Sequence, residues 1–288
     1  MAERRLPANG IEFHCLEEGG EGPLALLLHG FPDTAHTWRH LAPSLARKGY
    51  HVVAPFQRGY APTTVPHKPV FQTAALALDA CALHEALGGD SDAVLVGHDW
   101  GALAAYGAAA LEPQRWRRVV AMSVPHPSAL APAFFRYEQL RRSWYMFFFQ
   151  MPGAEVAASL DHFRFLYKLW DDWSPGYDAS WDLARVKESI GSPENLSAAI
   201  GYYRAQFDPS MQDPALAADQ AKCGAPTPQP VLYLHGGRDG CIGPEAAANI
   251  LEHLGKGSEQ FVIDDAGHFL HLEQPETVED LVTAFLSR

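Results

Sequence analysis

The chain has 288 residues, enough for one α/β domain with an inserted subdomain and too few for several large independent domains. Apolar residues make up 47% and charged residues 19%, which indicates a compact globular protein and excludes extended disorder. The formal net charge of −12 disfavours binding to nucleic-acid phosphates and to anionic membranes, so neither is expected as a partner.

The cysteines and the N-terminus suggest a cellular location. The four cysteines, at positions 15, 81, 223 and 241, form no CxxC pair, so we expect reduced thiols in a cytoplasmic protein. The opening residues, MAERRLPANG, have no apolar segment after their charges and are not expected to be a signal peptide. The apolar stretch at 144–149 is too short to span a bilayer.

Short apolar runs alternate with helical patterns over the first part of the chain. Strands are predicted at residues 24–28, 50–54, 93–96 and 119–123. Helices are predicted at residues 37–48, 73–87 and 101–111. Buried strands that alternate with helices indicate an α/β fold with a mostly parallel sheet, flanked by helices on both faces.

Residues 125–215 break this pattern, since they are rich in Trp, Tyr and Phe and read as helices without strands. The α/β pattern then resumes, with strands at 231–235 and 259–263 and helices at 245–254 and 275–286. We expect residues 1–124 and 216–288 to form one core domain and residues 125–215 to form an inserted helical cap. A separate second domain is the alternative, but neither α/β piece looks complete alone.

Residues 97–101 read Gly-His-Asp-Trp-Gly, between a predicted buried strand and an Ala-rich predicted helix. They have the glycine spacing of the G-x-S-x-G motif, with Asp99 in the place of the nucleophilic serine. That motif is a sharp turn that projects its middle side chain from the carboxyl edge of the sheet, where open α/β folds bind ligands. Asp99 is therefore the candidate nucleophile, and an ordinary helix N-cap is the alternative role.

The loop after the first predicted strand reads His-Gly-Phe-Pro over residues 29–32. In folds with this elbow, such a loop gives one backbone N–H to an oxyanion hole, and the residue after the nucleophile gives the other. The candidate donors are therefore Phe31 and Trp100, while a simple turn containing proline is the alternative for the loop.

Two more candidates follow the last two predicted strands. Asp239 lies in GGRDG and is the candidate acid, and His268 lies in AGHFL and is the candidate base. The order nucleophile, acid, histidine is the one expected for this elbow. Asp264 and Asp265 remain rival acids near His268. His271 lies close to His268 in sequence, but two histidines alone do not make a metal site, so none is expected.

Five segments together closely resemble the α/β-hydrolase-fold epoxide hydrolases, and the resemblance spans nearly the whole chain. They are HGFPDTAHTW, APFQRGYAPT, GHDWGA, GGRDG and AGHFLHLEQP. The resemblance implies two cap tyrosines that bind the epoxide oxygen. Tyr145 matches the one before a Phe-Gln-x-Pro-Gly segment, and Tyr203 matches the one in an aromatic-Tyr-Arg segment. Aromatic packing within the cap is the alternative role for both.

The resemblance implies hydrolysis of an epoxide to a vicinal diol through an ester on Asp99, without a metal or an organic cofactor. Attack on a saturated carbon by serine would end as a stable ether, whereas a carboxylate gives an ester that water can cleave. Phe31, Trp100, Tyr145 and Tyr203 are then the expected substrate-binding residues. Aromatic cap residues predict an apolar pocket for a small hydrophobic epoxide: Trp144, Phe147, Phe148, Phe149, Phe163, Phe165 and Trp170.

Two other functions remain open at this point. A haloalkane dehalogenase uses the same type of nucleophile, acid and base, but it needs side-chain N–H donors for the halide, and Phe31 offers none. A non-catalytic ligand-binding protein on the same fold usually lacks a triad member, and all three are present here. The oligomeric state is not determined by the sequence, and a homodimer is among the options.

Overall fold

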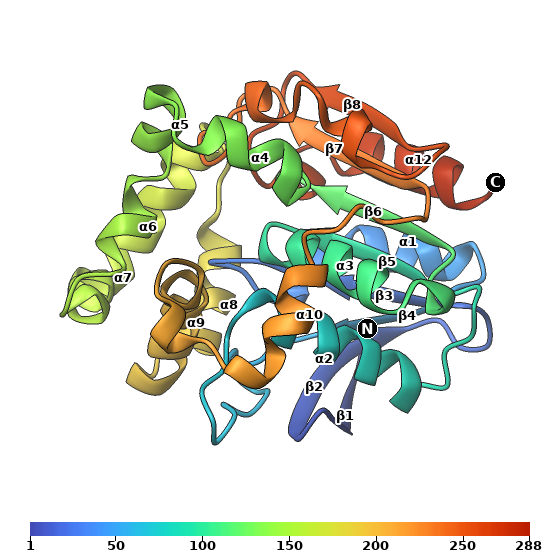
Figure 1. Ribbon diagram of the computed structural model, residues 1–288, viewed down its shortest axis with the longest axis horizontal. Helices are drawn as coiled ribbons and strands as arrows, with labels where there is room; N and C mark the ends of the chain where they lie inside the picture. The colour runs from blue at the N-terminus through green and yellow to red at the C-terminus, as the bar shows by residue number, and fades with distance from the viewer.

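The computed structural model describes all 288 residues, which form one eight-stranded sheet with helices packed around it (Figure 1). The strands lie side by side in the order β1-β2-β4-β3-β5-β6-β7-β8. Strands β3 to β8 pair in parallel, whereas β1 pairs antiparallel with β2, and β2 pairs antiparallel with β4. The bounds are β1 Ala2–Ala8, β2 Ile11–Glu18, β3 Leu24–Leu28, β4 His51–Pro55, β5 Val94–His98, β6 Arg118–Met122, β7 Val231–Gly236 and β8 Glu259–Ile263. The predicted mostly parallel sheet is confirmed.

Helices cover both faces of the sheet. On one face α2 (Thr73–Ala86) and α3 (Trp100–Leu111) pack together, and α10 (Ala217–Lys222) contacts both of them. On the other face α1 (Leu41–Arg47) packs against β4 and against α12 (Pro275–Leu286) (Figure 1). Short helix α11 (Leu270–Glu273) precedes α12. Since the sheet is covered from both sides, its central strands are almost wholly buried.

Two predicted helices were wrong in detail. Residues 245–254 were expected to form one helix, but they form two 3₁₀ turns, Pro244–Ala247 and Ile250–His253. The backbone of Asn249, at φ −112° and ψ 21°, is not helical and separates the two turns. Residues 37–48 likewise divide into a 3₁₀ helix, Ala35–Arg39, and the α-helix α1.

The first two strands were not predicted. The turn between them is Asn9-Gly10, with both residues at positive φ, 46° and 72°. This pair of conformations suits a two-residue hairpin turn. Strand β1 has mostly exposed side chains, so it lacks the continuous apolar run by which the central strands were recognised.

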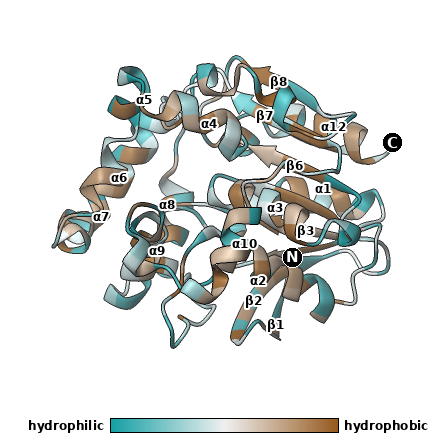
Figure 2. Cartoon of the chain, in the orientation of Figure 1, coloured by the Kyte–Doolittle hydropathy of each residue, from teal (hydrophilic) through white to brown (hydrophobic).

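Between β6 and β7 the chain forms no strand, and besides α10 it forms six α-helices, all within the range predicted as the cap. They are α4 (Pro127–Phe134), α5 (Tyr137–Arg142), α6 (Trp144–Phe148), α7 (Ala154–Trp173), α8 (Ser180–Ile190) and α9 (Pro193–Phe207). In Figure 1 this block lies to one side of the sheet, and in Figure 2 α5 is mainly hydrophilic and α6 mainly hydrophobic. None of the helices in the structure is both long and apolar enough to cross a membrane.

The strand register brings the loops that carry the predicted site residues to one edge of the sheet. Leu28 pairs with Gly97, and His98 pairs with Met122. Met122 in turn pairs with Leu234, and Gly236 pairs with Ile263. The loops after β3, β5, β7 and β8 therefore all begin at the carboxyl edge of the sheet, where open α/β folds bind ligands.

The elbow between β5 and α3 depends on a close approach at Gly101. A Cβ atom there would lie 1.9 Å from the carbonyl oxygen of Leu28 on the neighbouring strand. We expect Gly101→Ala to lower the free energy of unfolding by about 1–3 kcal/mol or more, because overpacking displaces backbone. Thermal or urea unfolding measures this. Gly20→Ala is the matched control, because nothing lies within 4 Å of its Cβ position. Equal stability of the two variants would contradict the expectation.

Candidate active site

Asp99 occupies the turn between β5 and α3 in a strained conformation. Its φ is 53° and its ψ is −118°, a region that residues other than glycine rarely adopt. The side chain is only 5% exposed and lines an internal cavity. Strain of this kind persists only where the surroundings enforce it, which is typical of a positioned nucleophile.

The loop after β3 holds one oxygen of this carboxylate. The backbone N–H of Phe31 donates to Asp99 Oδ1 at 2.7 Å. Gly30 leaves room for this contact, since a Cβ there would lie 2.3 Å from that oxygen. Trp100, the other predicted donor, begins α3 directly after Asp99. Phe31 therefore lies where a backbone donor can stabilise negative charge on an oxygen bonded to the Asp99 carboxyl carbon.

Asp239, His268 and Asp99 form a continuous series of contacts. His268 Nδ1 lies 2.9 Å from Asp239 Oδ2, and His268 Nε2 lies 3.6 Å from Asp99 Oδ2. All three side chains are buried. The rival acids, Asp264 and Asp265, are exposed on the surface. Asp239 is therefore the carboxylate that orients the imidazole.

The charges of this group stabilise one another. Burial on its own raises the pKa of Asp239, but the adjacent His268 and the N–H of Ile242 lower it below its ordinary value. The N–H groups of Cys241 and Ile242 donate to Asp239 Oδ1 at 2.7 and 2.9 Å. Burial also lowers the pKa of His268, but the carboxylates of Asp239 and Asp99 outweigh it and raise that pKa to about 10. With both carboxylates ionised, the imidazole is protonated.

Tyr145 on α6 and Tyr203 on α9 meet over this group. Their ring centroids are 5.6 Å apart, and the Tyr203 ring also contacts those of Phe31 at 5.2 Å and Trp100 at 5.1 Å. The hydroxyl of Tyr145 is 3.3 Å from the sulfur of Cys241, whereas the buried hydroxyl of Tyr203 has no hydrogen-bond partner. Burial and then nearby groups, Asp99 among them, raise the pKa of both phenols well above the ordinary value, so both are proton donors.

Tyr202, beside Tyr203, has a different role. Its hydroxyl donates to the carbonyl oxygen of Arg58 at 2.8 Å, and its ring stacks on Phe71. It therefore fastens α9 to the loop after β4. Of the two adjacent tyrosines, Tyr203 is the one that faces Phe31 and Trp100 with a free hydroxyl.

A cavity of about 450 Å³ lies beside Asp99, Trp100 and Tyr203. Its lining is mostly apolar: Leu103, Val124, Pro127, Leu130, Ala131, Phe134, Phe135, Met146, Phe207 and Ile242. The sequence-based choice of pocket residues was wrong, because none of the seven aromatic residues named above lines this cavity. Trp144 and Phe147 are largely exposed, and Phe149 packs against Tyr203 from behind. Whether a side chain lines the cavity depends on its position around its helix, which cannot be read from the residue type.

Comparisons with known proteins identify the family of this chain. The model of the α/β hydrolase fold family matches residues 23–275. Epoxide hydrolase A of Mycobacterium tuberculosis is 31% identical, over 99% of this chain and 97% of its own length. The chain belongs to the epoxide hydrolases of the α/β-hydrolase fold. The AB hydrolase superfamily protein YfhM of Bacillus subtilis is 30% identical, over 96% of this chain and 95% of its own length.

Solved structures of the family share the whole fold with this chain. The epoxide hydrolase of Bacillus megaterium, in complex with an inhibitor, superimposes with a TM-score of 0.84 at 27% identity and covers 99% of this chain and 100% of its own. Epoxide hydrolase A of Mycobacterium thermoresistibile gives a TM-score of 0.83 at 27% identity, with 99% and 98% covered. The core and the helical block between β6 and β7 are thus both features of the family.

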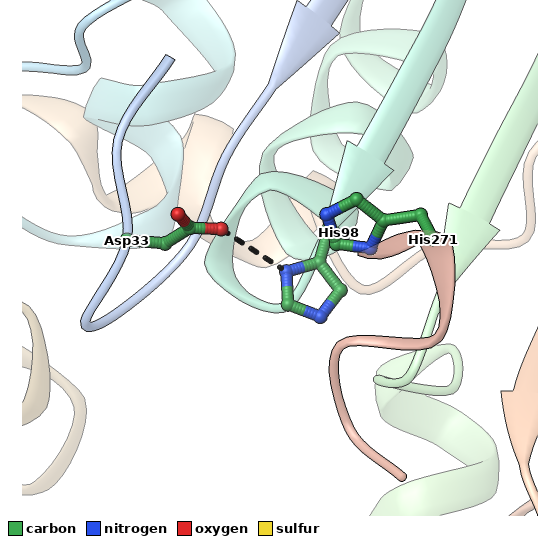
Figure 3. Close-up of side chains that lie close together, drawn as sticks. All are labelled: Asp33, His98 and His271. Atoms are coloured by element: carbon green, nitrogen blue, oxygen red, sulfur yellow. Dashed lines mark ion pairs between the residues drawn. The ribbon is translucent and has the colours of Figure 1, made fainter. Parts of the chain in front are cut away.

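A second buried polar cluster lies beside the triad and was not found from the sequence. Figure 3 shows Asp33, His98 and His271 facing one another. One carboxylate oxygen of Asp33 and one ring nitrogen of each histidine make no hydrogen bond. The facing atoms of Asp33 and His98 are 4.0 Å apart. These side chains are of types that bind zinc, but zinc ligands lie about 3.3 Å apart when each metal bond is ~2.0 Å. The cluster is therefore wider than a zinc site.

This cluster also touches His268. His98 Nε2 donates to the carbonyl oxygen of His268 at 2.9 Å, since a carbonyl can only accept. Burial and the neighbouring His268 lower the pKa of His98 to about 3, so its imidazole is neutral and Nδ1 is left as an acceptor. His98 therefore helps to fix the backbone of His268 without adding charge.

The coupling between Asp99 and His268 can be measured by titration. We expect Asp99→Asn to lower the pKa of His268 from about 10, because one of the two carboxylates that stabilise the imidazolium is removed. Nuclear magnetic resonance of the His268 ring nitrogens against pH measures this shift. Asp264→Asn, at an exposed carboxylate, is the control and leaves the pKa unchanged. An unchanged His268 pKa in Asp99→Asn would show that the two groups are not coupled.

Proposed function

We propose that this chain hydrolyses hydrophobic epoxides to vicinal diols through a covalent ester on Asp99. One observation carries the proposal: a buried carboxylate and a tyrosine hydroxyl without a partner line the same apolar cavity. The second phenol, Tyr145, lies against the first. An attacking carboxylate with proton donors opposite it is the arrangement that ring opening requires. The epoxide hydrolases among the relatives support the same activity.

The first step is substitution at a ring carbon. A carboxylate oxygen of Asp99 forms a bond to that carbon while the bond from carbon to the ring oxygen breaks. Tyr145 and Tyr203 bind the ring oxygen, and one of them transfers its proton, because an unprotonated alkoxide is a poor leaving group. The products are a hydroxyalkyl ester on Asp99 and one tyrosine phenolate.

Ester formation prepares the second step through its effect on charge. The ionised Asp99 contributes to the raised pKa of His268, and an ester has no charge to contribute. The pKa of His268 therefore falls when the ester forms, and the imidazole releases its proton to solvent and becomes a base. His268 is thus protonated while Asp99 is ionised, and it is a neutral base once the ester on Asp99 has to be hydrolysed.

Water then cleaves the ester. His268, oriented by Asp239, takes a proton from a water that attacks the Asp99 carbonyl carbon. The N–H groups of Phe31 and Trp100 stabilise the oxyanion, a contribution worth about 10²–10³ in rate for each donor. Collapse passes the proton that His268 took from water to the diol, and the carboxylic acid left on Asp99 protonates the phenolate. His268 then regains a proton from solvent beside the ionised Asp99, which restores the starting state.

The helical block from α4 to α9 acts in this proposal as a cap, because α6 and α9 bring both tyrosines to the sheet edge. We further propose that the enzyme works in the cytoplasm, since all four cysteines are free thiols. The apolar lining of the cavity supports a hydrophobic substrate.

The nucleophile can be identified by trapping the ester. We expect His268→Gln to accumulate an adduct on Asp99 after incubation with styrene oxide, because ring opening does not need the base but hydrolysis does. Intact mass spectrometry would show a gain equal to the whole epoxide, and peptide mapping would locate it. A matched incubation with 1-bromobutane tests the dehalogenase alternative. A butyl adduct with no epoxide adduct would overturn the proposal.

The tyrosines distinguish ring opening from other substitutions. We expect the double variant Tyr145→Phe, Tyr203→Phe to lose ring opening by at least about 10³-fold, within the range that general acids contribute. Single-turnover kinetics with styrene oxide would measure the loss. Tyr202→Phe is the control, because its hydroxyl bonds to Arg58 and not to the site. Near-normal ring opening in the double variant would refute the assignment.

A further inference from the structure

Cys241 touches the site but has no part in the steps above. It lies on the loop after β7, two residues after the triad acid Asp239. Its sulfur is 3.3 Å from the hydroxyl oxygen of Tyr145, and both side chains are fully buried. Of the two phenols expected to bind the epoxide oxygen, only Tyr145 has such a neighbour, since the hydroxyl of Tyr203 has no partner.

The loop that carries Cys241 is held from both sides. The N–H of Cys241 donates to Asp239 Oδ1 at 2.7 Å. Its carbonyl oxygen accepts a hydrogen bond from the side-chain amide of Gln139 on α5 at 2.9 Å, and the oxygen of that amide accepts from the N–H of Gly243 at 3.0 Å. Gln139 is itself buried. The sulfur therefore has a fixed place relative to both the triad acid and α5, the helix directly before α6.

The surroundings of the sulfur keep it protonated. Burial raises the pKa of the Cys241 thiol well above its usual value, and the negative charges of Asp239 and Asp99 raise it further. Either atom can be the donor while Tyr145 keeps its proton, but a phenolate can only accept, and the protonated thiol has an S–H to donate to it. A hydrogen bond to a charged oxygen is about twice as strong as one to a neutral oxygen. The contact gains strength when the phenol becomes a phenolate.

We propose that Cys241 is a positioning residue that orients Tyr145 and donates its S–H to the phenolate formed when Tyr145 protonates the opening epoxide. In this step the O–H bond of Tyr145 breaks and its proton goes to the substrate oxygen, while the S–H proton stays on sulfur. Tyr203 then binds the substrate oxygen without giving up its proton. This role presupposes the epoxide hydrolysis proposed above.

The test separates ring opening from ester hydrolysis. We expect Cys241→Ala to slow single-turnover ring opening of styrene oxide about 10–100-fold, since a hydrogen bond to a charged group is lost. The rate of ester hydrolysis should change less than about twofold, because it does not use the phenolate as a donor. Cys241→Ser keeps a donor at the same place and should recover ring opening to within a few-fold. Cys81→Ala, at another buried cysteine, is the control.

A double-mutant cycle makes the assignment specific. If the thiol acts through Tyr145, Cys241→Ala has no further effect on the residual ring-opening rate of Tyr145→Phe, whereas it keeps its effect in Tyr203→Phe. Equal slowing of ring opening and hydrolysis, no recovery with serine, or an undiminished effect in Tyr145→Phe would each overturn the role of Cys241. Loss of ring opening in the unaltered enzyme would instead refute the proposed function.

Discussion

The turn at Asp99 is the constraint on which the rest of the site depends. A non-glycine residue at φ 53° needs a strand and a helix that approach closely, and Gly97 and Gly101 permit this approach. A Cβ at Gly97 would lie 2.2 Å from the carbonyl oxygen of Gly101. Because the turn is tight, the Asp99 carboxylate projects from the sheet edge in a single direction. There the N–H of Phe31 and the ring of His268 lie beside its two oxygens.

The electrostatic balance of the site follows from this placement. Two buried carboxylates flank one imidazole, and together they stabilise its protonated form against the cost of burial. Loss of either negative charge changes the proton affinity of the ring, so the charge of Asp99 and the basicity of His268 are linked. The neighbouring His98 stays neutral and contributes a hydrogen bond instead of charge.

Much of the fold could be predicted because its central strands are continuous apolar runs that alternate with helical patterns. The candidate triad could be named because its members follow strand ends in a recognisable order, and the structure brings Asp99, Asp239 and His268 into contact. Their catalytic roles, like those of the two tyrosines, stay predictions. Strand β1 was not predicted, because its side chains are mostly exposed, although the pair Asn9-Gly10 marks the turn after it.

The lining of the cavity and the place of Cys241 could not be predicted from the sequence. Both depend on which side of a helix or loop faces inward, and α6 carries aromatic residues on its exposed side as well as on its buried side. Met146 lines the cavity, whereas its neighbours Trp144 and Phe147 are largely exposed. Cys241 belongs to no recognisable motif. Its contact with Tyr145 depends on how α6 packs against the loop after β7.

The helices that carry Tyr145 and Tyr203 are held by two different loops. Gln139 ties the helices around Tyr145 to the loop after β7, whereas Tyr202 ties the helix of Tyr203 to the loop after β4. Strands β4 and β7 are separated by three other strands in the sheet. The separation of the two hydroxyls therefore depends on two loops, of which the one after β7 also carries Asp239 and the one after β4 carries neither Asp99, Asp239 nor His268. Changes in the loop after β4 can then alter the spacing of the two phenols, while these three residues remain as they are.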